Sequence, residues 1–387
     1  MKKVKSKNLV VIIGNGFDRA HGLNTSYNDF SDYYLNEVIF NKIINFNDKS
    51  EFFHIKHKER LIKPEYIRYQ ISEGIAEERK LDKFIFNSKE KNKKLIIEYL
   101  INHKHMLKHI ISNVFLAKLY SNSYANWFEI EQAYFTELKY ILNGKREGLL
   151  KKLNIDFQEI KNAFKDYLGS KIKPEEKTGF FNSFKEHFKK RKQIAIVNFN
   201  YTKTIDLYNY RLNFKNYHIH GDINSEIIFG YGDDTDETYN EMKKTKNIEY
   251  LRFFKTFDYL KTTNYRSTLN AIEIFNEYDV LVIGHSLDTT DKTILRTILD
   301  NDKCNYIELL KRPDLETEKE KEEAHFELHA NLSRIFNSEK DLREKVISFE
   351  WSVNFPFLDD QEYTNFINRE KELYKQPSKT SVRVINR

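Results

Sequence analysis

The chain has 387 residues, of which 40% are hydrophobic and 14% aromatic, so it is a globular protein with a substantial core and not a disordered chain. Lys and Arg total 64 against 58 acidic residues, and because the two signs are interleaved, the net charge of +6 does not by itself indicate a nucleic-acid surface. The sequence has no run of eighteen apolar residues, no signal-peptide core behind its basic N-terminus and a single cysteine, Cys304, which excludes a membrane span, a disulfide framework and a cysteine zinc site. We therefore expect a cytoplasmic protein.

The first predicted element is a buried strand over residues 9–13, a short run of apolar and mostly β-branched residues that ends at Gly14-Asn15-Gly16. Two glycines at this spacing let the chain turn tightly and let a ligand come close, and we expect the backbone N–H groups there to point outward, toward a phosphate. The pattern alone fits an ordinary strand-to-loop turn equally well, because Arg19 stands where the dinucleotide fingerprint has its third glycine.

The segment after this turn is predicted to be a long polar loop, because His21-Gly22-Leu23 interrupts any helix that starts near Asp18. Thr25 and Ser26 offer an N-cap for a helix that runs to about residue 36. The polar side chains of the loop suit a ribose as well as a pyrophosphate; they are Asn15, Asp18, Arg19, Asn24 and Thr25.

Residues 41–191 have a different character, with five glycines, two prolines and apolar residues that recur at three- and four-residue spacing. We predict a large α-helical insertion here, which divides the chain into a nucleotide-binding domain, 1–40 with 192–387, and an inserted helical domain, 41–191. Within the insertion, Trp127-Phe128-Glu129-Ile130-Glu131 fits a buried aromatic stripe with solvated glutamates, or an acidic residue, Glu131, directed into a cleft.

Strand patterns return after residue 191 and alternate with helical patterns. The predicted strands cover residues 194–197, 217–220, 279–283, 306–310 and 346–349, with a helix at about 318–336. This alternation predicts an α/β protein with a Rossmann-like parallel sheet.

Polar residues follow four of the predicted strands, and ligands of open parallel sheets bind where the strands end. These residues are Asn15 with Asp18, Asn200 with Thr202, His218 with His220, and His285 with Ser286. We therefore expect them to converge on one site. Strand alternation places His218 and His220 on the same face, so either one fits a functional role, and His220 lies nearer the strand end.

These motifs resemble the AbiH family of bacterial abortive-infection proteins. The resemblance is carried by IIGNGFDRAHGLNTSYNDF near the start, NFNYTKTIDLYN and HIHGDI in the middle, VLVIGHSLDTTD late in the chain, and the WFEIE segment. The same order of motifs is similar, more distantly, to sirtuin-like NAD-binding domains of phage-defence NADases.

The resemblance implies a sirtuin-like sheet with NAD as substrate or ligand, with Asn200 and His220 as catalytic residues. It assigns NAD binding to Gly14, Gly16, Phe17, Gly284, Ser286 and Asp291. The polar loop and the strand ends add Asn15, Asp18, Thr25 and His285 to the expected NAD-binding residues. Two positions depart from the sirtuin-like pattern, because Asn15 replaces a small residue and Asp18 replaces a serine. The four-cysteine zinc site of deacetylating sirtuins has no counterpart, so we expect no metal and favour NAD hydrolysis over deacylation.

The leading hypothesis is an abortive-infection effector that binds NAD and hydrolyses its nicotinamide–ribose bond. The alternative is a module that only senses NAD or a related nucleotide, and a nucleic-acid-binding or nuclease role ranks last because no nuclease-type metal cluster is evident. The partners we expect are the nucleotide, further copies of the chain, and a phage-derived or partner-protein trigger, but no membrane. The sequence leaves the trigger and the oligomeric state open.

Overall fold

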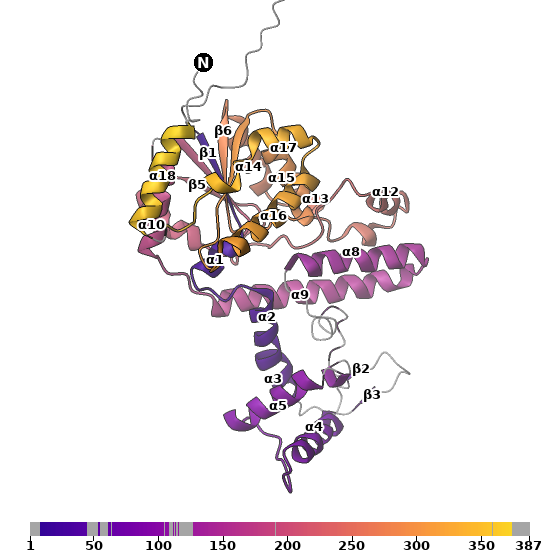
Figure 1. The fold of residues 1–387 in the computed structure, drawn as a ribbon. Coiled ribbons are helices and arrows are strands. Elements are labelled where there is room, and N and C mark those ends of the chain that lie inside the picture. Colours follow the sequence, from indigo (N-terminus) through magenta and orange to yellow (C-terminus); the bar gives the residue numbers. More distant parts are fainter. Residues whose placement is uncertain are drawn as a thin grey trace, which may run out of the picture. The chain divides into compact units, whose positions relative to one another are not determined.

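The computed structural model describes residues 8–44, 53–54, 61–62, 64–103, 105–107, 111, 113, 115, 127–189, 191–357 and 359–373 (Figure 1). The chain divides into two compact units: unit 1 is Met1–Leu23, Ile172–Tyr239 and Phe254–Arg387, and unit 2 is Asn24–Lys171 and Asn240–Phe253. The division expected from the sequence, at residues 41 and 192, is therefore different from this one. Helix α10 (Thr178–Phe188) belongs to unit 1, and a second, short segment joins unit 2.

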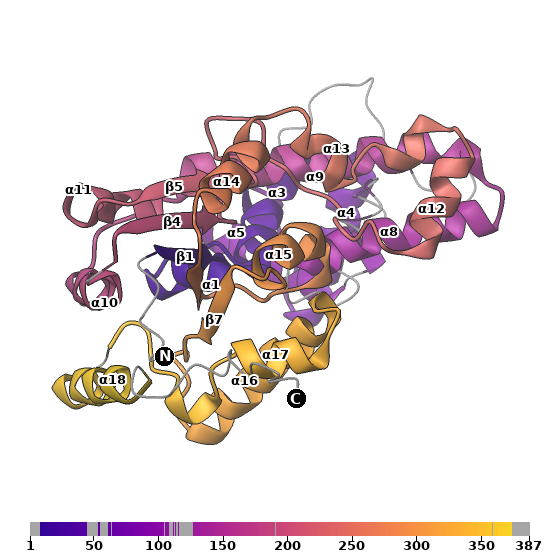
Figure 2. The same ribbon diagram turned by 90° about the horizontal axis from the view of Figure 1, so that it is seen from above.

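Unit 1 is built around a five-stranded sheet in the described part of the chain, with the order β5-β4-β1-β6-β7 (Figures 1 and 2). The strands are β1 (Asn8–Ile13), β4 (Gln193–Asn198), β5 (Lys215–His218), β6 (Tyr278–Ile283) and β7 (Cys304–Leu309). All four neighbouring pairs are parallel, which confirms the predicted Rossmann-like α/β class. From β1 the chain continues to β4 and β5 on one side and later to β6 and β7 on the other. The strand order therefore reverses between β1 and β6, as it does at the ligand crevice of Rossmann folds.

The register places the carboxyl ends of four strands at one level. Ile13 pairs with Asn198 and with Ile283, and Asn198 pairs with His218. The residues that follow these positions therefore leave the sheet together at one edge.

Both faces of the sheet are buried, which explains why the strands are continuous apolar runs without polar alternation. Val10 and Ile12 face a core that includes Phe199 and residues of α14 (Asn264–Glu273), α15 (Lys292–Leu299) and α16 (Glu318–Ile335). Leu9, Val11 and Ile13 face a second core, to which Phe17 of α1 (Asn15–Ala20) and Phe184 of α10 belong.

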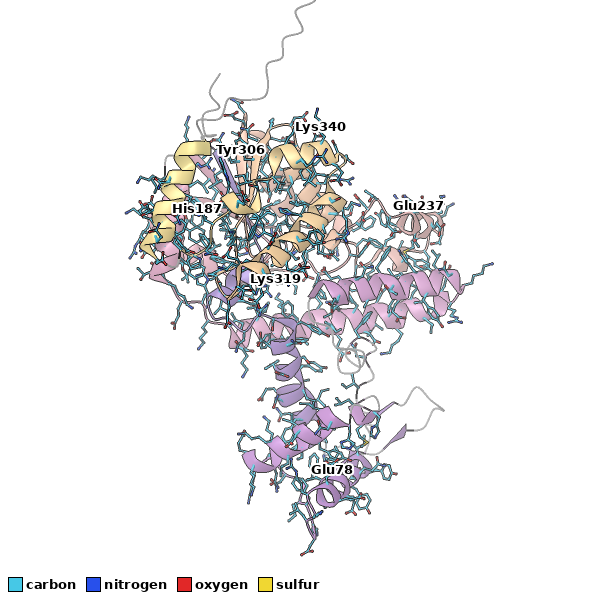
Figure 3. All side chains as sticks on the ribbon, in the orientation of Figure 1. Glu78, His187, Glu237, Tyr306, Lys319 and Lys340 are labelled. Carbon is cyan, nitrogen blue, oxygen red and sulfur yellow. The ribbon has the colours of Figure 1, made fainter. Side chains whose placement is uncertain are left out.

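The other described elements of unit 1 connect and cover the strands. They are α1 (Asn15–Ala20), η3 (Thr204–Tyr208), α11 (Asn209–Leu212), α13 (Lys255–Tyr259), α14 (Asn264–Glu273), η5 (Thr289–Asp291), α15 (Lys292–Leu299), α16 (Glu318–Ile335), α17 (Glu339–Lys345), η6 (Phe349–Trp351) and α18 (Asp360–Leu373). Helix α10 lies beside α18, with the rings of His187 and Phe366 4.8 Å apart; His187 is labelled in Figure 3. The aromatic side chains of α10, a helix that the sequence assigned to the helical insertion, therefore pack within unit 1.

Two predicted strands differ from the structure. Strand β5 ends at His218, so the sequence-based strand over 217–220 was placed two residues too late. Residues 346–349 were predicted as a strand, but only an isolated bridge joins Ile307 and Val346, and the 3-10 helix η6 starts at Phe349. An apolar run without a ladder partner of matching length does not form a strand.

Unit 2 is mainly helical. Its described elements are α2 (Tyr27–Tyr33), η1 (Tyr34–Ile39), α3 (Phe40–Ile44), β2 (Phe53–His54), β3 (Leu61–Ile62), α4 (Pro64–Glu78), α5 (Glu90–Asn102), α8 (Trp127–Asn143), η2 (Glu147–Leu149), α9 (Leu150–Lys171) and η4 (Ile248–Leu251), and α12 (Glu237–Lys244) starts in unit 1 and continues here. The predicted cap of the first helix is confirmed, because Ser26 and Asp29 form a capping box at the start of α2. Aromatic rings join the long helices α8 and α9, with Tyr134 and Phe157 4.3 Å apart.

The WFEIE segment begins helix α8, and the side chains of Trp127 and Phe128 lie outside the described residues. Ile130 and Tyr134 are buried, as the aromatic-stripe interpretation predicts. Glu131 is buried as well, so the expectation of a solvated glutamate at this position is wrong. None of the helices in the described residues combines the length and apolar character needed to cross a membrane.

Candidate functional site at the carboxyl edge of the sheet

The loops that follow β1 and β6 are in backbone contact. Gly14 N–H donates to the carbonyl of Ile283 at 3.1 Å, and Gly16 N–H donates to that of Gly284 at 2.8 Å. A Cβ atom on Gly16 would lie 2.7 Å from Cα of Gly284, and Gly284 has a φ of +65° that favours glycine. These glycines are therefore required for the close packing of the two loops.

This contact corrects one expectation about the phosphate site. The N–H groups of Gly14 and Gly16 are used by the β6 loop, and Phe17 N–H donates to the carbonyl of Gly14 at 2.9 Å, where α1 begins. The prediction that the N–H groups of Gly14 and Gly16 point outward is therefore wrong. Gly16, Gly284 and Ser286 are nevertheless exposed. At these three residues, next to the point where the strand order reverses, no bulky side chain of their own covers the backbone.

Asp18, on α1, is 1% exposed although it carries a carboxylate. Its Oδ2 accepts a hydrogen bond from Thr202 Oγ1 at 2.6 Å, and Thr202 Oγ1 lies 3.0 Å from Thr204 Oγ1. Its Oδ1 is buried and has no hydrogen-bond partner among the described residues. Burial raises the pKa of Asp18 to about 6, against the opposing effects of Thr202, Thr204, His218 and Asn200.

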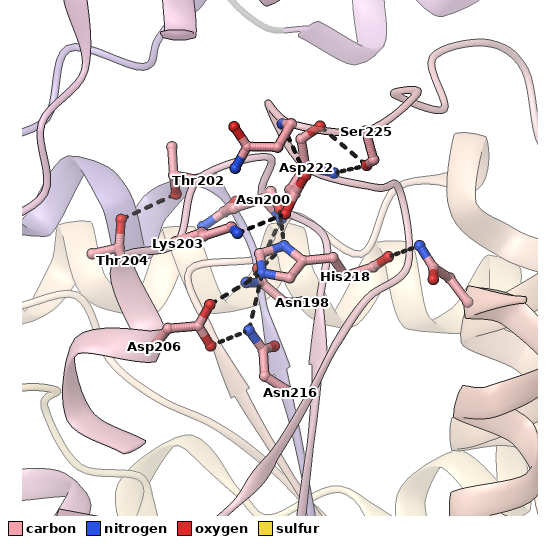
Figure 4. Close-up of polar contacts among 12 residues, drawn as sticks. Asn198, Asn200, Thr202, Lys203, Thr204, Asp206, Asn216, His218, Asp222 and Ser225 are labelled. Carbon is pink, nitrogen blue, oxygen red and sulfur yellow. Dashed lines mark hydrogen bonds and ion pairs between the residues drawn. The ribbon is translucent and has the colours of Figure 1, made fainter. Parts of the chain in front are cut away.

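Asn200 ties the loop after β4 to the loop after β1. Its side-chain amide donates to the carbonyl of Gly14 at 3.0 Å, and its own N–H donates to Oδ1 of Asn198 at 2.9 Å. His218 lies in the same network, with Nδ1 3.1 Å from the carbonyl of Asn200 and Nε2 3.6 Å from Oδ2 of Asp206 (Figure 4). His218 therefore belongs to the group that holds the β4 loop, and its nitrogens are occupied by protein groups.

The second polar group is an ionic cluster around Asp291, which we call the Asp291 cluster: Lys255, His220, His285 and Asp291. Lys255 Nζ donates to Asp291 Oδ1 at 2.8 Å, and His220 Nε2 lies 3.0 Å from the same oxygen. His285 Nε2 is 3.8 Å from Oδ2. All four side chains are buried, Lys255 with only 1% of its surface exposed.

The charges of the Asp291 cluster compensate one another. Burial alone would raise the pKa of Asp291, but Lys255 and the two histidines hold that pKa well below its ordinary value. Burial lowers the pKa of His220, with Asp291 opposing and Lys255 adding to the shift, and burial lowers the pKa of His285 to about 4. At neutral pH the cluster therefore contains an ionised Asp291 and two neutral histidines.

Hydrogen bonds fix the orientation of the two histidines. Leu287 N–H donates to Nδ1 of His285 at 2.8 Å, so the ring proton of neutral His285 is on Nε2, toward Asp291. His220 Nε2 is also 3.3 Å from the hydroxyl of Tyr259. The ring of Phe199 contacts both histidines, with centroid distances of 5.2 Å to His220 and 4.2 Å to His285.

The predicted site residues thus fall into two groups within unit 1. One contains Gly14, Asp18 and Asn200, and the other contains His220, His285 and Asp291, with His285 next to Gly14. Asn200 and His220 hold different partners, so the expectation that they form one paired unit finds no direct contact to support it. Thr25 is buried in unit 2, ahead of α2, and its role in NAD binding stays a prediction, as do those of Asn15, Phe17 and Ser286.

Lys255 was not among the predicted site residues, because it lies on the short helix α13 and far from any strand end. Lysine is rarely buried, and nothing in its spacing links it to Asp291, 36 positions later in the chain. Its aromatic neighbours Phe253, Phe254 and Phe257 were the available indication that this part of the chain is buried. In the described residues, no group of three or more His, Cys, Asp or Glu side chains is arranged to hold a metal ion.

The sheet and its carboxyl edge together define a Rossmann-like α/β protein with two buried polar groups at that edge. The sequence model of one protein family, described as bacteriophage abortive infection AbiH, matches residues 10–311, which include every strand of this sheet except the first two residues of β1. The chain therefore belongs to the AbiH family of abortive-infection proteins. No curated protein and no solved structure matches the chain significantly.

Proposed function

We propose that this AbiH protein is an abortive-infection effector that binds NAD at the carboxyl edge of the unit 1 sheet and hydrolyses its nicotinamide–ribose bond. The observation that supports this proposal is the gathering of Asp18, Asn200, His220, His285 and Asp291 around the point where the strand order reverses. Open parallel sheets bind ligands at this position. The order of the motifs, similar to that of sirtuin-like NAD-binding domains, favours NAD as the nucleotide.

The dinucleotide would lie across the ends of β1 and β6. Gly16, Gly284 and Ser286 are exposed there, so a ligand can approach the backbone closely. Since the N–H groups of Gly14, Gly16 and Phe17 are occupied, the pyrophosphate would need other donors at this edge.

The reaction needs little covalent chemistry from the protein. The C1′–N bond breaks with its electron pair leaving on nicotinamide, and the ribose passes through an oxocarbenium-like state that water attacks, as in glycoside hydrolysis. Asn200 would act as a positioning residue, because its amide holds the Gly14 carbonyl and hence the β1 loop. His220, oriented by Asp291 at 3.0 Å, would contact and orient a ribose hydroxyl of the bound NAD.

One observation favours a second candidate, a module that binds the nucleotide without cleaving it. The four side chains of the Asp291 cluster are buried and satisfy one another, an arrangement that also suits rigid support of a binding surface. The two candidates differ in turnover and not in where the nucleotide binds.

The test is to incubate the purified protein with NAD, quantify nicotinamide and ADP-ribose by chromatography, and measure NAD binding by calorimetry. The proposal expects both products in equal amounts from the wild type and most of the rate lost in His220→Ala. Asp222→Asn, which removes a carboxylate that pairs with the half-exposed Lys203 and accepts the Asn224 N–H, is the matched control and should keep its rate. Binding without product would support the sensing module. Neither binding nor product, together with unchanged NAD in phage-infected cells that express the protein, would contradict the proposal.

A further inference from the structure

One carboxylate oxygen, Asp18 Oδ1, lacks a hydrogen-bond partner within the described part of the chain, near the point where the strand order reverses between β1 and β6. Asp18 Oδ1 is buried and has no hydrogen-bond partner among the described residues, while Oδ2 of the same carboxylate is held by Thr202 Oγ1 at 2.6 Å. Buried polar atoms without partners are rare in folded proteins, and at active sites such an atom often awaits a ligand. Asp18 also lies in α1, two residues after Gly16, next to the strand ends where a ligand of this fold is expected.

His220 is less suited to take a proton from water in this arrangement. Its Nε2 faces Asp291 Oδ1 at 3.0 Å and the Tyr259 hydroxyl at 3.3 Å, so this nitrogen is already occupied. Asp18 differs, because Thr202 anchors its Oδ2 while its buried Oδ1 has no hydrogen-bond partner among the described residues. A base needs a lone pair that no protein group already occupies, within hydrogen-bond reach of the water that it activates.

We propose that Asp18 is the catalytic base of this site and that its Oδ1 accepts a proton from the water that attacks C1′ of the nicotinamide ribose. This inference rests on the proposed NAD hydrolysis. The water oxygen forms the new bond to C1′, the C1′–N bond breaks with its electron pair leaving on neutral nicotinamide, and the proton passes from the water to Asp18 and then to solvent. NAD and water thus give nicotinamide, ADP-ribose and one proton.

The electrostatic surroundings of Asp18 suit this role. Burial raises its pKa to about 6, so the carboxylate is mostly ionised at neutral pH yet more basic than an ordinary aspartate. The groups that lower the pKa from neighbouring elements are Thr202, Thr204 and Asn200 after β4, and His218 of β5, the only titratable one among them. Arg19, on the same helix, is exposed.

The central experiment compares the pH dependence of nicotinamide release by the wild type, Asp18→Asn and Thr202→Val. The wild-type kcat/KM should fall as the pH drops through about 6, because protonated Asp18 cannot act as a base. Asp18→Asn should lose about a hundred- to ten-thousand-fold in kcat while the NAD dissociation constant changes little. Thr202→Val removes the hydrogen bond that stabilises the Asp18 carboxylate, so its acidic limb should move to higher pH, a shift that a merely structural Asp18 would not produce.

Each outcome decides the assignment. Asp222→Asn is again the control, and it should keep both the rate and the wild-type pH profile. Wild-type protein that binds NAD but releases no nicotinamide would overturn the proposed hydrolysis and the base with it. An active wild type with an equally active Asp18→Asn would overturn only the base. If Asp18→Asn fails to fold, the pH profile of kcat/KM for Thr202→Val decides. An acidic limb at the same pH as in the wild type would then overturn the assignment.

Discussion

The ion pair between Lys255 and Asp291 gives the sharpest prediction about stability. The two charges are 2.8 Å apart and buried, with Lys255 1% and Asp291 9% exposed. Removing one partner of a buried pair leaves the other charge uncompensated, which typically destabilises a protein by about 3–5 kcal/mol. Lys255→Met keeps the length and apolar stem of the side chain and removes the charge, so we expect a loss of this size at pH 8.

The cluster geometry adds a pH dependence to this prediction. Lys255 lowers the pKa of both His220 and His285, so both pKa values should rise in Lys255→Met. A histidine whose folded-state pKa rises takes up a proton more readily in the folded state than before, and the new charge replaces the missing ammonium beside Asp291. The destabilisation should therefore shrink as the pH falls from 8 to 5.

Urea unfolding followed by circular dichroism at several pH values measures this directly. The control is Lys203→Met, because Lys203 is half exposed in its pair with Asp222 and such pairs contribute only about 0–1 kcal/mol. The double variant Lys255→Met/Asp291→Asn should lose less than the sum of its single variants, since both charges are gone. A Lys255→Met protein as stable as the wild type at pH 8, or one whose deficit grows toward pH 5, would refute the reasoning.

Three further predictions concern the edge of the sheet. Gly16→Ala should destabilise the protein by about 1–3 kcal/mol, because the new Cβ would meet the Gly284 backbone at 2.7 Å, whereas Gly169→Ala on α9 meets nothing within 4 Å and should be neutral or stabilising in the same thermal unfolding assay. Asn200→Ala and His220→Ala should each abolish most nicotinamide release and be strongly non-additive, so a double variant whose loss equals the product of the single losses would argue against a shared site. Activity should survive EDTA, and its complete loss with recovery on adding zinc or magnesium would instead favour the nuclease hypothesis.

The sheet could be predicted from the sequence because each strand is a short apolar run with a distinct end. β1 and β6 were placed to within one residue, since Gly14 and Gly284 close both runs. The end of β5 was placed too late, because the spacing of His218 and His220 suits a strand that continues to residue 220, whereas the last ladder pair of β5 is at His218. Where a ladder stops depends on the neighbouring strand, which local sequence does not show.

The candidate site was predictable in its location but not in its contacts. The strand-end rule placed His220 and His285 at one edge, the resemblance added Asp291, and the structure joins the three. The rule could not find Lys255, because its partner Asp291 is distant in the chain and buried lysines are rare. The tight spacing of Gly14 and Gly16 was interpreted as a place for a ligand, and packing against the β6 loop supplies another reason for it that no local pattern reveals.

The central claim is that NAD lies at the carboxyl edge of the sheet, and a structure of the wild-type protein with carba-NAD tests it most directly. In this analogue a carbon replaces the ring oxygen of the nicotinamide ribose, so the bond resists hydrolysis. We expect the nucleotide to lie across the ends of β1 and β6, in contact with Gly16 and Gly284, with the nicotinamide ribose within reach of Asp18. Carba-NAD bound elsewhere on the protein, or no binding at concentrations that saturate NAD-binding proteins, would contradict the account.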